Sequence, residues 1–251
     1  MTDRGRSRPP RRSGPATPRD DRAAPAGPTP KTTADPGLAV RKQAVDVLFA
    51  TLDEGRPLDQ VLDHRATMPA WRALTPADRG LVRAVVSTTL RRLGLVDDAL
   101  KRLMDRPLPT KAARVREILR VAATQMLFMD VPDHAAVSLA TELAGRDPTT
   151  SPWKAMVNGV LRSLGREKDE ILADQDTTRL VTPLWLWRDW CETWGEEKAR
   201  AFATAHMVEP ALDLTVKSDP EGWARRLGGR VLPTGSVRLV PHGPIDRMEG
   251  F

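Results

Sequence analysis

Asn158 and Arg162 stand one helical turn apart in the stretch KAMVNGVLRSLGRE, residues 154–167, and together offer hydrogen bonds and a positive charge. The dipeptide Asn158-Gly159 by itself indicates a tight hairpin. The surrounding apolar residues instead recur at helical spacing: Met156, Val157, Val160, Leu161 and Leu164. We therefore predict a helix whose polar strip, with Asn158 and Arg162, could contact RNA phosphate or sugar. The pattern favours plain helix–helix packing, with Gly159 allowing close approach by another helix, and RNA contact is the alternative.

Five basic residues at the ends of expected helices are further candidates for phosphate contact: Arg79, Arg91, Arg92, Lys111 and Arg114. Lys111 and Arg114 stand near a helix start, where cations do not suit the helix dipole. Arg91 and Arg92 end a helix, where cations do suit it, and could extend a basic patch. For Arg79 the alternative is a structural role beside a helix cap.

Residue types for metal or covalent chemistry are sparse. The chain has one cysteine, Cys191, and four scattered histidines, so we expect no disulfide and no structural metal. The acids form no pair that suggests general acid–base catalysis.

Trp187, Trp190 and Trp194 fall on one helical face, which favours packing over stacking on RNA bases. No run of 18 apolar residues occurs, so we predict a cytoplasmic protein without a membrane span.

Most of the excess charge lies at the N-terminus. Residues 1–36 hold eight Arg or Lys and four Asp, a net charge of +4 out of +6 for the chain. Eight prolines in the same segment leave too little apolar surface to offset the entropy of ordering it. We predict a disordered basic tail that attracts phosphate backbones in a salt-sensitive way.

The rest of the chain is predominantly helical by its apolar spacing and its caps. Helices are expected over 38–52, 58–66, 76–93, 95–104, 110–128, 134–144, 151–166, 183–194 and 196–208. Two strands, 212–217 and 236–240, then flank a short helix at 219–228. The predicted class is mainly α: an all-α bundle followed by a small α/β subdomain. That subdomain is expected to be incomplete, because a parallel sheet needs more covered strands.

Several phrases resemble one family in their order along the chain. They are RKQAVDVLFATLDEG, LTPADRGLVRAVVSTTLRRLGLVDDAL, REILRVAATQMLFMDVPDHAAVSLATELA and VNGVLRSLGRE. Together they resemble the NusB-like N-terminal domain of bacterial 16S ribosomal RNA cytosine-5 methyltransferases, the RsmB (Sun/Fmu) group of the RsmB/Nop family. The stretch TPLWLWRDWCETWGEEKARAFATAHMVEPALDLTVK resembles the linker that follows. In related NusB proteins, basic residues of the first helix contribute to RNA binding, and Arg41 and Lys42 stand there.

The resemblance also implies a part that the printed sequence does not contain. The family's catalytic domain is a Rossmann-like fold with a glycine-rich S-adenosylmethionine loop and two catalytic cysteines, one after a proline. No G-x-G-x-x-G or related loop occurs here, and Cys191 follows a tryptophan. We therefore carry over no catalytic or cofactor-binding residue and predict that this chain is inactive alone.

The expected organisation has three parts: a disordered basic tail at 1–36, a NusB-like RNA-binding domain at 37–170, and a helical linker with the start of an α/β subdomain at 171–251. The predicted function is to position ribosomal RNA for an S-adenosylmethionine-dependent methyltransferase domain of the same polypeptide. A free-standing NusB-like RNA-binding protein in transcription antitermination is the alternative. A protein-interaction scaffold that binds no RNA is a third possibility.

Overall fold

The computed structural model describes residues 36–239 and 248–250. The predicted disorder of residues 1–36 concerns a segment that, except for Pro36, lies outside the described residues. The chain divides into Met1–Thr33 and Ala34–Phe251, and all elements below belong to the second unit. Among the described residues, no helix is long and apolar enough to cross a membrane.

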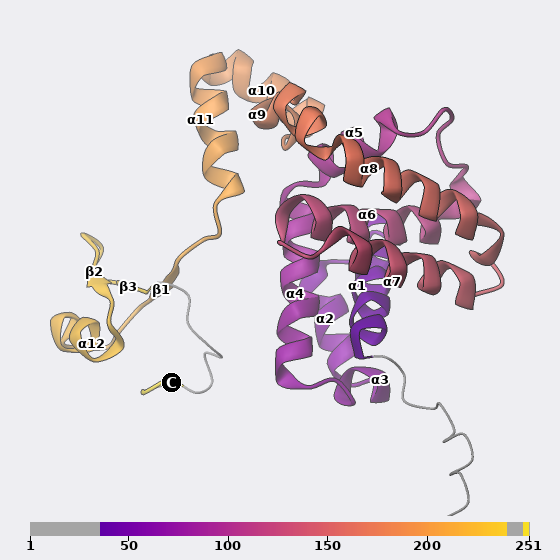
Figure 1. Ribbon diagram of the computed structural model, residues 1–251. Coiled ribbons are helices and arrows are strands. Elements are labelled where there is room, and N and C mark those ends of the chain that lie inside the picture. The colour runs from indigo at the N-terminus through magenta and orange to yellow at the C-terminus, as the bar shows by residue number, and fades with distance from the viewer. Residues whose placement is uncertain (1–35, 240–247, 251) are drawn as a thin grey trace, which may run out of the picture. The chain divides into compact units, whose positions relative to one another are not determined.

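A helical bundle forms the larger part of this unit (Figure 1). Its helices are α1 (Pro36–Leu52), α2 (Leu58–Ala66), α3 (Pro69–Arg72), α4 (Pro76–Arg91), α5 (Leu93–Arg102), α6 (Ala113–Phe128), α7 (Asp133–Arg146) and α8 (Lys154–Asp174). Two 3-10 turns, Thr110–Ala112 and Ser151–Trp153, lead into α6 and α8. The predicted mainly α class is confirmed, and the boundaries of the expected helices mostly shift by one to three residues.

Helix α6 is the centre of the bundle and packs against α1, α4, α5, α7 and α8. Apolar side chains on several of its faces are buried, including Val115, Leu119 and Ala123. Every residue from 117 to 126 is buried, so this stretch of α6 must also bury polar groups. Glu117 and Gln125 are accordingly at most 1% exposed.

Local capping explains some helix starts, but Thr110 is an exception. Thr75 begins α4 with a reciprocal capping box: its side chain accepts from the Asp78 amide, and the Asp78 carboxylate accepts from the Thr75 amide. Thr110, expected to cap the long central helix, instead begins a 3-10 turn, and α6 starts at Ala113. A 3-10 turn is a common way for a helix terminus to tighten.

The predicted stripe of α8 is confirmed: Val157, Val160, Leu161 and Leu164 are buried. The packing role expected for Gly159 is wrong, because a Cβ atom built there meets nothing within 4 Å. The close approach occurs at Gly165, where a Cβ would lie 3.2 Å from an Asp133 carboxylate oxygen. We expected the bundle helix to end at Arg166. Helix α8 instead runs eight residues further, to Asp174.

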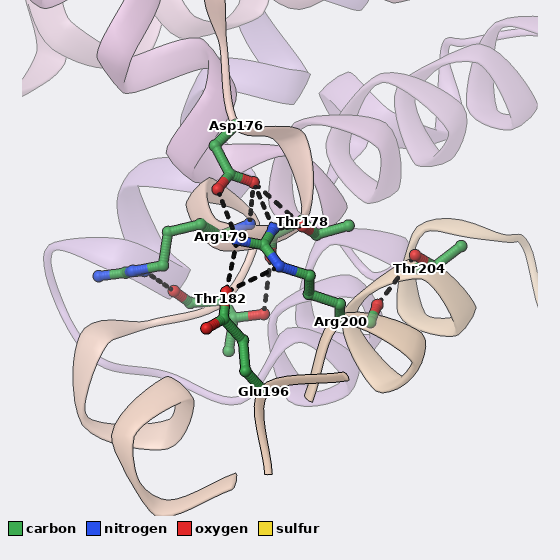
Figure 2. Close-up of polar contacts among 7 residues, drawn as sticks. All are labelled: Asp176, Thr178, Arg179, Thr182, Glu196, Arg200 and Thr204. Atoms are coloured by element: carbon green, nitrogen blue, oxygen red, sulfur yellow. Dashed lines mark hydrogen bonds and ion pairs between the residues drawn. The ribbon is translucent and has the colours of Figure 1, made fainter. Parts of the chain in front are cut away.

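Three helices follow the bundle: α9 (Thr177–Leu180), α10 (Leu184–Trp194) and α11 (Glu196–Met207). The tryptophan stripe of α10 packs on α11, as predicted, with the Trp190 ring 5.5 Å from the Phe202 ring. Figure 2 shows how α9 is held: the Arg200 guanidinium donates to Asp176, Thr178 and Glu196 at 2.7–3.1 Å. The Arg200 and Arg179 guanidinium groups both lie over the Trp187 ring, at 5.4 and 5.6 Å from its centroid.

The C-terminal elements are β1 (Leu212–Leu214), α12 (Pro220–Leu227), β2 (Arg230–Val231) and β3 (Val237–Leu239). The strand order is β1-β3-β2, and both pairings are antiparallel. Our expectation of an incomplete parallel unit was therefore wrong in direction, and β2 was not predicted. In this register Leu214 faces Val237 and Leu212 faces Leu239, so one side of the sheet is apolar.

Candidate nucleic-acid interface

Two of the predicted contact residues, Lys42 and Arg114, meet at one buried carboxylate. Asp46 on α1 has a side chain that is 4% exposed. It accepts from Lys42 at 2.8 Å, from Arg114 of α6 at 2.8 Å and from Arg65 of α2 at 3.2 Å. We call Asp46 with these three cations the Asp46 cluster. Three elements that are distant in sequence thus bring three positive charges together.

Electrostatics keep this carboxylate ionised. Burial alone would raise the pKa of Asp46, but the hydrogen bonds from Lys42 and Arg114 outweigh burial and hold the pKa below its usual value. The Asp46 cluster carries a net charge of +2, and the nearby Asp147 carboxylate, whose charge interacts with Arg114 and Lys42, offsets part of it. The Arg114 guanidinium also lies over the Phe49 ring, 5.0 Å from its centroid, which fixes its orientation.

An apolar pocket of about 430 Å³ adjoins the Asp46 cluster. Helices α1, α6 and α7 supply its apolar wall, which includes Leu38, Val45, Ile118 and Leu143. Lys42 and Arg114 also line it. The Lys42 side chain remains 58% exposed, so its ammonium group can meet a second anion besides Asp46. Lysine and arginine side chains are the groups with which proteins contact nucleic-acid phosphates.

Asn158 and Arg162 line a different cavity, a groove of about 640 Å³ between α7 and α8. We call it the α7–α8 groove and define it by the residues His134, Ser138, Thr141, Lys154, Asn158 and Arg162, with Val137 and Leu161 among its apolar lining. Asn158 is half-buried and Arg162 is exposed. The polar strip predicted from the sequence therefore lies along a hollow, on α8.

The other predicted contact residues lie apart from these two sites or have structural partners. Arg79 donates to the Leu74 carbonyl at 3.2 Å, which supports the structural alternative for it. Arg41 donates to Gln125 and to the Gly37 carbonyl, both at 3.2 Å. Lys111 is exposed on the 3-10 turn before α6.

Arg91 and Arg92 stand where α4 meets α5. Both are half-buried, and the Arg92 guanidinium lies 5.2 Å from the centroid of the Phe128 ring. Burial lowers the pKa of Arg92, and the neighbouring Arg91 charge lowers it further. These two residues therefore form a compact pair of cations, which is compatible with the basic patch expected there.

Sequence reasoning missed Asp46 and Arg65, which hold the cluster together. Asp46 stands four residues after Lys42, and that spacing was a usable local signal for an ion pair. Nothing local marks Arg65, because its partner is 19 residues away. Cys191 is half-buried with a free thiol. Within residues 36–239 and 248–250, no group of three potential metal ligands gathers.

The family model described as "NusB family" matches residues 38–166, which is just over half of the chain. The chain therefore belongs to the NusB family. A solved structure, T. maritima NusB, is 21% identical with a TM-score of 0.45 and covers 56% of this chain and 99% of its own.

Curated relatives extend the similarity beyond the bundle. Ribosomal RNA small subunit methyltransferase B of Xanthomonas campestris pv. campestris is 33% identical over 228 residues, which is 87% of this chain and 50% of that protein. The protein of the same name from Cronobacter sakazakii is 27% identical over 227 residues, 85% of this chain and 51% of that protein. The chain thus spans about half the length of the curated relatives that it matches.

Proposed function

We propose that residues 37–170 bind ribosomal RNA and position it for an S-adenosylmethionine-dependent cytosine-5 methyltransferase domain of the same polypeptide. Residues 171–251 are then the helical linker and the start of an α/β subdomain before that domain. The basic segment 1–36 adds sequence-independent attraction to RNA. We expect this activity in the cytoplasm, because ribosomal RNA and the methyl donor are found there.

The Asp46 cluster is the observation that carries this proposal. Three cations from α1, α2 and α6 converge on a single carboxylate, so the cluster has positive charge left over for phosphate. A phosphate oxygen near Lys42 and Arg114 would place the attached base beside the apolar pocket. The names of the curated relatives supply the kind of RNA, because both are small-subunit ribosomal RNA methyltransferases.

S-adenosylmethionine supplies the methyl group in such chemistry, and the described residues do not fit it. Their short strands are antiparallel, in the order β1-β3-β2. Nucleotide-type cofactors bind where a parallel strand runs through a glycine-rich turn into a helix. We therefore derive no catalytic step from this chain, and its own residues act by binding and orienting RNA.

The test is a titration of labelled 16S ribosomal RNA fragments with the purified chain, followed by fluorescence anisotropy at several salt concentrations. We expect affinity to fall as salt rises. Lys42→Gln should weaken binding and lower the salt slope by about 0.7 per lost phosphate contact. Asp46 keeps Arg65 and Arg114 in this variant, so the fold is retained.

Lys101→Gln is the matched control. Lys101 is an exposed lysine in the last turn of α5, outside the Asp46 cluster, and its loss should leave affinity unchanged. Absent or salt-independent binding would overturn the RNA-binding proposal in favour of a protein-interaction scaffold. If Lys42→Gln and Lys101→Gln change the affinity equally, the Asp46 cluster is not part of the RNA-binding surface.

A free-standing RNA-binding protein in transcription antitermination is the second candidate, favoured by the NusB family match over residues 38–166. The native protein, detected with an antibody to residues 38–170, separates the two candidates. A species heavier than 27.7 kDa by roughly another domain supports the methyltransferase proposal. A species of 27.7 kDa would support the free-standing protein.

A further inference from the structure

The α7–α8 groove is built from two opposed rows of polar side chains. Lys154, Asn158 and Arg162 recur every fourth residue on α8 and rise about 12 Å along it. The facing row on α7 includes His134 and Ser138. The helices run in opposite directions, because Gly165 of α8 approaches Asp133 and Gly145 of α7 approaches Lys154.

The charges along the groove are unevenly satisfied. Asp133 pairs with Lys168 of α8 at 2.9 Å, and Glu142 pairs with Arg146 at 2.5 Å. Both acids that line the groove are thereby neutralised within the protein. Lys154 and Arg162, in contrast, take part in no side-chain hydrogen bond or ion pair found among the described residues. The groove therefore presents positive charge to a ligand.

Neutral hydrogen-bonding groups lie between the two cations. The Asn158 amide and the Ser138 hydroxyl likewise have no side-chain partner in the described part of the chain. The Thr141 hydroxyl is shielded from solvent and also lacks a partner. A buried polar atom without a hydrogen bond is costly, so these groups favour a ligand with hydroxyl and oxygen atoms of its own.

We infer that the α7–α8 groove holds the sugar–phosphate backbone of a single-stranded RNA segment. Phosphates lie at Lys154 and Arg162, and a ribose 2′-hydroxyl hydrogen-bonds with Asn158 and Ser138. This inference rests on the proposed RNA-binding function and adds a second contact, which recognises the sugar. The 2′-hydroxyl is a donor and an acceptor, and so are the amide and hydroxyl that face it.

The occupant follows from charge, polarity and the proposed function. An acidic peptide would satisfy the two cations, and its backbone amides could also pair with the neutral groups, so we set it aside because the proposed ligand of this domain is RNA. DNA would satisfy the cations equally well and would lack the hydroxyl. RNA supplies both features at once, because its ribose carries the 2′-hydroxyl that distinguishes RNA from DNA.

The experiment measures binding of one labelled single-stranded RNA and of the DNA with the same sequence, at several salt concentrations, using the full chain. Arg162→Ala should lower the salt slope for both ligands by about 0.7. Arg166→Ala is the matched control on the same helix, because its side chain is engaged by Ser163 and the Arg162 carbonyl and does not line the groove. Arg166→Ala should leave the slope unchanged.

Asn158→Ala should weaken RNA binding about 5-fold, the loss expected for one hydrogen bond, and leave DNA binding unchanged. Ser138→Ala should act in the same direction. Thermal unfolding of each variant confirms that the fold persists.

Each other result overturns the inference. Equal slopes for Arg162→Ala and Arg166→Ala would remove the groove from the interface. An equal loss for RNA and DNA with Asn158→Ala would remove the sugar contact. If binding of labelled poly-glutamate, measured in the same way, is lost with Arg162→Ala while RNA binding is unchanged, the groove is a protein-docking site. In all three cases a Lys42→Gln defect would leave the proposed function standing, whereas no RNA binding by the wild-type chain would end both.

Discussion

At the scale of single residues, Glu117 is the most unusual side chain in the bundle. It is fully buried on α6, where one carboxylate oxygen accepts from Arg120 at 2.6 Å and the other has no hydrogen-bond partner in the described residues. Burial raises the pKa of Glu117 from 4.5 to about 7, with Asp53 adding to the rise and Arg120 opposing it. The folded protein therefore binds a proton more tightly than the unfolded chain does.

This shift predicts a pH-dependent stability with a definite sign. Between pH 4.5 and about 7 the unfolded chain has lost the Glu117 proton and the folded protein retains it, so the free energy of unfolding falls as pH rises. Glu117→Gln should abolish this part of the decline, on the order of 3 kcal/mol at most. Urea unfolding at pH 5, 6, 7 and 8 measures it.

Glu170→Gln is the control for that series, because Glu170 is an exposed residue of α8. Its pH profile should follow the wild type. Because the rest of the sequence is shared, the difference between the Glu117→Gln and wild-type profiles isolates Glu117. Identical profiles for Glu117→Gln and the wild type would show that Glu117 is already ionised at pH 5 in the folded protein.

At the scale of elements, the helical glycines separate into those that allow contact and those that do not. Gly94 stands between the helices expected at 76–93 and 95–104, but in the structure it lies within α5. A Cβ atom there would lie 1.7 Å from the Leu180 carbonyl oxygen, so α9 can pack on α5 only because residue 94 has no side chain. Gly159 on α8 faces open space.

Opposite effects on stability follow for the two alanine substitutions. Gly159→Ala should raise the free energy of unfolding by up to about 1 kcal/mol, the helix propensity gained without a clash. Gly94→Ala should lower it by about 1–3 kcal/mol, because α9 must move away from α5. Urea unfolding measures both, and limited proteolysis around residues 175–183 should be faster for Gly94→Ala. A Gly94→Ala variant as stable and as resistant as the wild type would contradict the contact.

At the scale of the whole molecule, the described residues form two separate apolar cores. The first joins buried residues of the bundle from Val40 to Ile171. The second is small and consists of Ala224, Val237 and Leu239 with partly buried neighbours. The clusters share no residue, and the second buries far less apolar surface, so the sheet should open at a lower free energy than the bundle.

Amide hydrogen exchange should show these cores as two cooperative units. We expect the slowest exchange in α6 and much faster exchange in β1 and β3. Val237→Ala should speed exchange in the strands and leave α6 unchanged, whereas Leu119→Ala should speed it throughout the bundle, with a cost of about 2–5 kcal/mol. Faster exchange in α6 after Val237→Ala would mean that the two cores unfold as one.

The sequence by itself determined the mainly α class, most helix positions and the inward face of α8. These features follow from short-range chemistry: apolar spacing, a capping box at Thr75 and prolines at helix starts. The same signals placed Asn158 and Arg162 on one polar strip. These short-range signals were weaker for the 3-10 turn at Thr110 and for β2, which is two residues long.

Tertiary structure alone decided which residues meet. Asp46 accepts hydrogen bonds from Arg65, 19 residues away in the sequence, and from Arg114, 68 residues away. No local sequence pattern encodes contacts over such separations. The roles of Gly94, Gly159 and Gly165 depend on what lies opposite each glycine, which is a property of packing. The antiparallel sheet, likewise, depends on pairing between β1 and β3, whose partner residues lie 23 or more positions apart in the sequence. Contacts between distant segments depend on the shape of the whole core, and that shape exists only in the folded chain.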